Sequence, residues 1–194
     1  MKGITELLAE LGFENQEDLL NGLKAYFEQQ QYQWLDQQII GFRMDDDYTD
    51  EFTDWIIALK TDEIIAVQAS TKAGSYWLEK QAVATLKEGQ YKGMWRIGTT
   101  SWSGDKYLQQ VQPCEVYRDG SKLGHIDRDS EVQTGLFGIN EHSWRGFGEG
   151  NKVGNLSEGC QVCDELENDA LWTIIKTFKG DIDYTLIFKE AFLS

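Results

Sequence analysis

The chain has 194 residues, and its 33 acidic against 18 basic residues give a formal net charge of −15. A charge of this sign repels phosphate backbones and anionic membrane surfaces, and no basic cluster offsets it, so we expect no nucleic-acid partner. Hydrophobic residues make up 41% of the sequence and aromatic residues 12%, which is enough to bury a sizeable core. The composition therefore predicts one main domain with a small appendage.

Targeting signals are not evident in the sequence. Met1-Lys2-Gly3-Ile4-Thr5-Glu6 leads into an acidic amphipathic segment rather than the apolar core of a signal peptide, and no apolar run approaches the length of a membrane span. We therefore expect synthesis in the cytoplasm and no membrane insertion. The three cysteines are an odd number, which fits a reducing compartment better than a disulfide scaffold.

Residues 1–36 differ from the rest of the chain in their hydrophobic pattern, which predicts a helical hairpin. Apolar residues repeat at helical spacing on either side of Gly12, and Asn15 is placed to cap the second helix. Two interpretations remain open for this hairpin: it packs on the main domain, or it serves as a module that binds the cell wall or another partner. We set the boundary of the main domain at residues 37–194.

The main domain is expected to be mainly β, a sandwich or barrel-like core with one or two helices. Short segments rich in β-branched and aromatic residues predict strands at 39–42, 55–59, 64–67, 82–86, 95–98, 107–117, 136–140 and 184–188. An apolar stripe at Leu171, Ile174, Ile175 and Phe178 predicts one helix. Acidic residues at 164, 165 and 167 suit a helix start, so we expect this helix to begin near Cys163.

His142 and Cys160 are the strongest candidates for a catalytic base and nucleophile. A free thiol with a pKa near ~8.5 is largely protonated at neutral pH, so a catalytic cysteine needs an activator. His142 is one of only two histidines, lies close in sequence and could accept the thiol proton, whereas His125 falls in a polar turn. Backbone N–H groups around Gly159 and Cys160 are candidate donors to an oxyanion.

Electrostatic effects on this thiol oppose one another. The N-terminus of the predicted helix would lower the pKa of Cys160, and the carboxylates of Glu158, Asp164 and Glu165 would raise it. The alternative is that Cys160 is a buried structural thiol and His142 an ordinary strand residue. Cys160 and Cys163 also form a C-x-x-C, which could be a redox pair or, with Cys114 and His142, a zinc site.

Two loops carry weaker signals. Residues 119–129 have the acidic first position and central glycine of a calcium loop, but Leu123 and Ser130 stand where ligands are needed, so a polar turn between strands is favoured. Residues 144–150 are rich in glycine without the pattern of a phosphate-binding loop, and we expect them to form a wall of the cleft. Trp144 and Phe147 could contact substrate there or shield the core.

The spacing from His142 to Ser157-Glu158-Gly159-Cys160 resembles the histidine and S/T-H-G-C signature of the L,D-transpeptidase (YkuD-type) family. The similarity extends over roughly residues 38 to 188 and is greatest to a phage and prophage branch that reads G-x-F-G-I-N-x-H-R and S-A-G-C-Q-V. It implies His142 as base, Cys160 as nucleophile, and Ser157 and Gly159 as the hydroxyl and glycine of the motif. Glu158 replaces the second histidine, and Ser143 replaces the arginine usual in the branch.

The resemblance implies a cysteine peptidase or acyltransferase that acts on peptidoglycan stem peptides without cofactor or metal. Hydrolysis is favoured over cross-linking, because the second motif histidine and the basic residue after the cysteine are missing. Candidate substrate-binding residues are Trp144, Arg145, Glu158 and Gln161. Two alternatives stay open: a catalytically silent protein that binds cell-wall peptide, and a thiol-redox protein using Cys160 and Cys163. We expect the protein to act at the cell wall after release or delivery. The sequence does not set its oligomeric state.

Overall fold

The computed structural model describes residues 3–101, 105–143, 152–163 and 165–194. Within these residues the protein is mainly β, as predicted, and its larger sheet is a closed barrel with the strand order β1-β11-β5-β6-β9-β10-β3-β2. The strands are β1 (Gln37–Arg43), β2 (Asp54–Lys60), β3 (Glu63–Ser70), β5 (Gly89–Thr99), β6 (Lys106–Gln110), β9 (Glu141–Ser143), β10 (Gln161–Cys163) and β11 (Ile182–Phe188). The β1–β11 and β9–β10 pairs are parallel, and the other neighbours are antiparallel.

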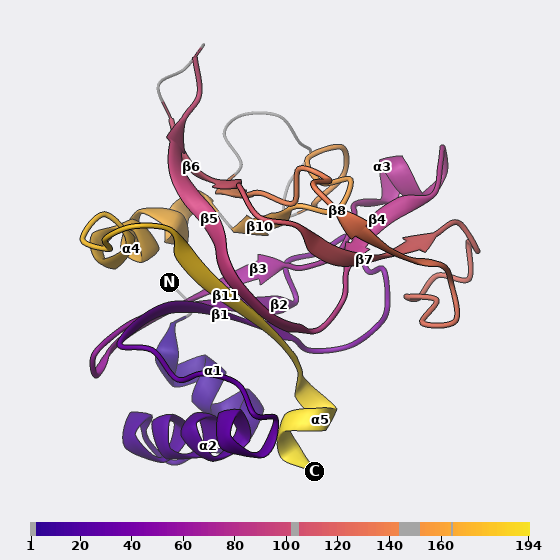
Figure 1. Cartoon of the computed structure of the whole chain (residues 1–194). Helices are drawn as coiled ribbons and strands as arrows, with labels where there is room; N and C mark the ends of the chain where they lie inside the picture. Colours follow the sequence, from indigo (N-terminus) through magenta and orange to yellow (C-terminus); the bar gives the residue numbers. More distant parts are fainter. Residues whose placement is uncertain (1–2, 102–104, 144–151, 164) are drawn as a thin grey trace.

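A second sheet of three strands stands beside the barrel (Figure 1). It consists of β4 (Val83–Leu86), β7 (Cys114–Asp119) and β8 (Val132–Gly135), all antiparallel. The short helix α3 (Ser75–Leu78) precedes β4. This small sheet matters for the candidate site, because the turn that carries Cys160 packs against β4.

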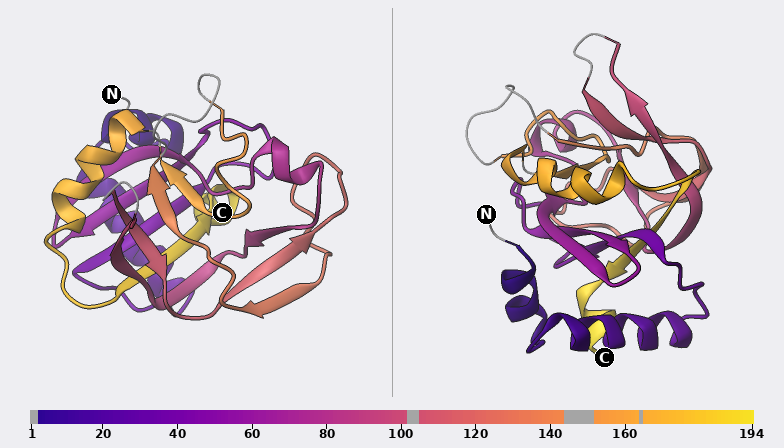
Figure 2. Two further views of the ribbon diagram at one scale, coloured as in Figure 1. Left: turned by 90° about the horizontal axis from the view of Figure 1, so that it is seen from above. Right: turned by 90° about the vertical axis from the view of Figure 1, so that its left-hand side faces the viewer.

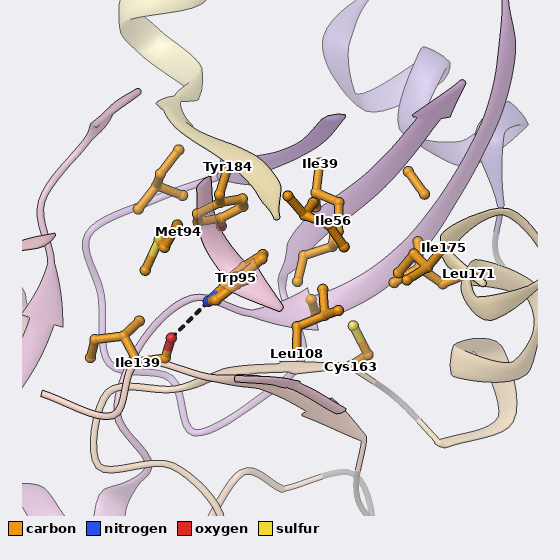
Figure 3. Close-up of a cluster of buried hydrophobic side chains, with 14 of the residues drawn as sticks. Ile39, Ile56, Met94, Trp95, Leu108, Ile139, Cys163, Leu171, Ile175 and Tyr184 are labelled. Carbon is orange, nitrogen blue, oxygen red and sulfur yellow. Dashed lines mark hydrogen bonds between the residues drawn. The ribbon is translucent and has the colours of Figure 1, made fainter. Parts of the chain in front are cut away.

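The barrel interior is filled by apolar side chains from most of its strands (Figure 3). Trp95 and Tyr184 stack with ring centroids 4.2 Å apart, and the Trp95 indole N–H donates to the carbonyl oxygen of Ile139 at 2.8 Å. Helix α4 (Glu165–Ile175) adds Leu171, Ile174 and Ile175 to the same cluster. Figure 2, in its right-hand view, shows α4 lying along the side of the barrel.

Residues near the N-terminus form the expected helical hairpin, α1 (Ile4–Leu11) and α2 (Gln16–Gln29). The Asn15 side chain caps α2 by accepting the Asp18 backbone N–H at 2.9 Å. The hairpin and α5 (Lys189–Leu193) lie together on one side of the barrel (Figure 1). Buried residues of both helices share a second apolar cluster with the outward side chains of β1 and β2, among them Ile40 and Trp55. The hairpin thus packs on the main domain.

Three local expectations were wrong. The predicted strand at 107–117 is two strands, β6 and β7, separated near Pro113, whose ring removes a backbone donor. Residues 136–140 are not a strand, and Gly138 has a φ of 75° there, which bends the chain before β9. The number of helices was also underestimated, because α3 and α5 are too short to show a periodic pattern.

Helix α4 begins two residues later than expected. Cys163 ends strand β10 instead of opening the helix, and Phe178 lies beyond its last residue, Ile175. Among the described residues, no helix is long and apolar enough to cross a membrane.

Candidate functional site

Cys160 sits at the end of a tight turn that precedes β10. Ser157 holds the turn closed: its hydroxyl accepts the Gly159 N–H at 3.0 Å and donates to the carbonyl oxygen of Cys160 at 2.8 Å. The turn is fixed to the small sheet by the Ala84 N–H, which donates to the carbonyl oxygen of Glu158 at 3.2 Å. Ser157 is fully buried, so its role in this geometry is to shape the turn rather than to meet a substrate.

Gly159 is required by close packing. A Cβ atom at this position would overlap the carbonyl oxygen of Ala84 and lie 3.1 Å from Cδ1 of Ile139. The glycine therefore lets the cysteine turn approach the backbone of β4. Its N–H is already engaged by Ser157, whereas the Cys160 N–H has no hydrogen-bond partner among the described residues. Of the two donors expected for an oxyanion, the Cys160 N–H is the one that fits.

The β9–β10 pair aligns His142 with the strand that the cysteine turn leads into. The strands are parallel, with His142 opposite Val162. Cys160 directly precedes β10, two residues before Val162, and the Asn140 backbone N–H, two residues before His142, approaches its thiol. Gln161 and Cys163 point into the barrel.

In the resting geometry the two side chains do not hydrogen-bond to each other. The Cys160 thiol lies 3.2 Å from the carbonyl oxygen of Gly138, and Nδ1 of His142 lies 3.2 Å from the carbonyl oxygen of Ser143. Because a carbonyl oxygen can only accept, Nδ1 carries a proton, which leaves Nε2 of the neutral ring as an acceptor. Cys160 lines a cavity of about 280 Å³, and His142 lines a separate one of about 330 Å³ that shares none of its lining residues.

Burial keeps both groups neutral. Desolvation raises the pKa of the Cys160 thiol, the nearby Asn140 backbone N–H lowers it, and the carboxylates of Glu158 and Glu141 raise it further. Desolvation also lowers the pKa of His142, against a smaller opposite effect of the hydrogen bond to Ser143. The site therefore rests as thiol and neutral imidazole, not as a thiolate–imidazolium pair.

Helix α4 contributes less to the thiol than the sequence suggested. We expected Cys160 directly before the helix N-terminus, but β10 lies between them and α4 begins at Glu165. Because the effect of a helix dipole falls off within the first turn, it does not activate Cys160 here.

Gln161 was expected to bind substrate and is placed differently. Its side chain is fully buried, accepts the Tyr184 hydroxyl at 2.8 Å, and donates to the carbonyl oxygen of Gly159 at 3.3 Å. It supports the cysteine turn from inside the barrel. Glu158, by contrast, is exposed and lines the Cys160 cavity, with the Gln81 amide donating to its carboxylate. Trp144, Arg145 and Phe147 lie outside the described residues.

Gln110 is a supporting residue that the sequence did not reveal. Its side-chain oxygen accepts the N–H groups of Phe137 and Ile139 at 3.0 and 2.9 Å, and its amide nitrogen donates to the carbonyl oxygen of Gly135 at 3.1 Å. These bonds fix the irregular segment that presents Gly138 to the Cys160 thiol. Gln110 is one of three glutamines between positions 109 and 112 and carries no periodic or motif signal, so only the fold identifies it.

The redox and metal interpretations gain no support from the geometry. No disulfide joins Cys114, Cys160 and Cys163, and Cys163 is fully buried in the barrel core. In the part of the chain that the structure describes, no group of three His, Cys, Asp or Glu side chains is placed to hold a metal ion. Asp119, the first residue of the calcium-like loop, instead accepts hydrogen bonds from Ser121, Asp127 and Tyr48.

Comparison with known proteins gives no assignment: no family model matches the chain, and no curated protein matches it significantly.

Proposed function

We propose that the protein is a cysteine-dependent acyl-transfer enzyme, with Cys160 as nucleophile and His142 as general base. The observation that carries this proposal is the parallel register of β9 and β10, in which His142 lies opposite Val162, two residues beyond Cys160. The orientation of His142 adds support, because Nδ1 is occupied by the carbonyl oxygen of Ser143 and Nε2 is left to accept a proton.

The reaction proceeds in two steps. The Cys160 sulfur attacks the amide carbonyl carbon while its proton passes to Nε2 of His142, and the Cys160 N–H donates to the developing oxyanion. The C–N bond then breaks, and the proton moves from His142 to the leaving amine, which leaves a thioester on Cys160. For the first step the thiol must rotate away from the carbonyl oxygen of Gly138. Water attacks the thioester, releases a carboxylic acid and restores the thiol.

Peptidoglycan stem peptides are the proposed substrate, and water is the proposed main acyl acceptor. The substrate class is inferred from the resemblance of the His142 and Ser157-Glu158-Gly159-Cys160 signature to the L,D-transpeptidase family. Preference for water is inferred from Glu158, which stands in the place of a motif histidine and lines the cavity. The protein would act on the wall after release or delivery.

The proposal is tested by incubating purified protein with isolated sacculi and identifying the muropeptides by mass spectrometry. Shortened stem peptides that are absent with Cys160→Ala are the expected result. New dimeric muropeptides without shortened stems would contradict hydrolysis and indicate cross-linking. No change with any wall type would remove the enzymatic proposal.

A catalytically silent protein that binds cell-wall peptide is the second candidate. The resting geometry favours it, because the Cys160 thiol is bonded to the carbonyl oxygen of Gly138 and its pKa is raised. The rate of alkylation of Cys160 against pH separates the two. A base-assisted thiol reacts measurably near neutral pH, and a structural thiol reacts only as it ionises in alkaline solution.

A further inference from the structure

Arg118 approaches the candidate nucleophile from the small sheet. It lies on β7 directly opposite Ala84 of β4. Ala84 is also the residue that holds the cysteine turn, since its N–H binds the carbonyl oxygen of Glu158 and its own carbonyl oxygen abuts Gly159. Arg118 thus stands one strand away from the turn, and it lines the same cavity as Cys160.

The guanidinium group of Arg118 has no hydrogen bond or ion pair with any described residue, although the chain is strongly acidic. The other arginines in the described ranges are all engaged. Arg43 binds Thr71, Leu86 and Glu88, Arg96 pairs with Asp181, and Arg128 pairs with Asp46 and Glu88. An unpaired, partly buried arginine beside a candidate nucleophile is therefore a feature that packing and ion pairing within the described residues do not explain.

We propose that Arg118 is a specificity-determining residue that binds a carboxylate of the acyl donor. The proposal rests on the acyl-transfer function proposed above and narrows its substrate to peptides with a free carboxylate near the reacting carbonyl. The planar guanidinium fork suits bidentate binding of a carboxylate. Glu158 lines the same cavity and repels anions, so the carboxylate is directed to the Arg118 side.

Anionic and neutral thiol reagents test this arrangement without turnover. Iodoacetate carries a carboxylate and iodoacetamide does not, so the ratio of their rates at Cys160 reports the positive potential in the cavity. Rates are measured by mass spectrometry of the Cys160 peptide in the wild type, Arg118→Gln, Arg118→Lys and Arg96→Gln. The Arg96 variant is the matched control, because it loses the same charge from an exposed site that lines neither described cavity.

We expect Arg118→Gln to lower the iodoacetate-to-iodoacetamide ratio about threefold or more. Arg118→Lys should keep the ratio within about twofold, since it keeps the charge, and Arg96→Gln should not change it. An Arg118→Gln ratio equal to that of Arg96→Gln would overturn the proposal. If Arg118→Gln fails to fold, an Arg118→Lys ratio that matches the wild type supports it, and a ratio that falls threefold contradicts it.

A protection experiment distinguishes a carboxylate site from a merely positive cavity. N-acetyl-D-alanine should slow alkylation of Cys160 by iodoacetamide more than its C-terminal amide does, and this preference should disappear in Arg118→Lys because bidentate pairing is lost. Equal protection by acid and amide in the wild type would refute a carboxylate anchor. If the wild type gives no muropeptide products but its iodoacetate-to-iodoacetamide ratio still depends on Arg118, the proposed function is refuted and the anion-binding role of Arg118 is not.

Discussion

Glu141, next to the candidate base in sequence, allows the effect of burial on the pKa of a carboxyl group to be tested. It is fully buried on β9, and neither of its oxygens has a hydrogen-bond partner among nitrogen or oxygen donors of the described residues. Burial raises the pKa of Glu141 from 4.5 to about 7, and the neighbouring Cys163 thiol opposes this only weakly. The native state therefore holds the Glu141 proton at pH values where the unfolded chain has lost it.

The sign and size of the effect on stability follow from proton linkage. With a folded-state pKa above the unfolded value, the stability associated with Glu141 is fully present below pH 4.5 and is lost as the pH rises through about 7. A shift of this size corresponds to about 3 kcal/mol at alkaline pH. Glu141→Gln keeps the size and shape of the side chain but cannot ionise, so it should remove the loss of stability at alkaline pH.

Urea unfolding of both proteins from pH 4 to 9, followed by tryptophan fluorescence, measures the difference. We expect Glu141→Gln to gain up to about 3 kcal/mol relative to the wild type between pH 5 and 8, with little pH dependence of the difference outside that range. Glu63→Gln, a change at an exposed position on β3, should show no such gain. Parallel stability curves for wild type and Glu141→Gln would refute the inference that burial raises the pKa of this carboxyl.

Five further variants test the cysteine turn and its surroundings. Cys160→Ala should abolish muropeptide products without unfolding the protein, whereas Cys163→Ala should keep most activity and lose about 1 kcal/mol by urea unfolding. His142→Ala should slow iodoacetamide alkylation of Cys160 near neutral pH, and unchanged kinetics would exclude the base. Glu158→Ala should keep or raise that rate, because it removes a nearby negative charge; a large loss would give Glu158 a direct role. Gly159→Ala should cost about 3 kcal/mol in urea unfolding, and a smaller loss with unchanged alkylation would contradict the tight approach to Ala84.

Much of the secondary structure could be predicted from local periodicity in the sequence. The hairpin was visible because its leucines repeat at helical spacing and Asn15 caps the second helix. Strands β1 and β2 were visible as continuous apolar runs because both of their faces are buried, one in the barrel and one under the hairpin. Barrel closure itself depends on pairings between distant segments, such as β1 with β11, which no local pattern encodes.

The sequence motif pointed to the candidate residues but not to the contacts that support them. The motif indicated Cys160 and His142, but β10 has only three residues, too few to show an alternating pattern. The segment before β9 looked like a strand because it is apolar, although Gly138 bends it and Gln110 supplies its hydrogen bonds in place of a sheet neighbour. Side-chain bonds between residues almost thirty positions apart leave no trace in composition.

The two faces of the β9–β10 pair bear on the proposed acyl-transfer site in different ways. Outward, the pair presents His142 and Cys160, which no hydrogen bond joins in the resting state. Inward, it buries Glu141 and Gln161, although burying polar groups destabilises a fold unless their bonds are satisfied. Gln161 meets this condition by binding Tyr184 and the cysteine turn. A nucleophile needs its position fixed closely. We infer that the buried amide of Gln161 serves to hold the cysteine turn in position from inside the barrel.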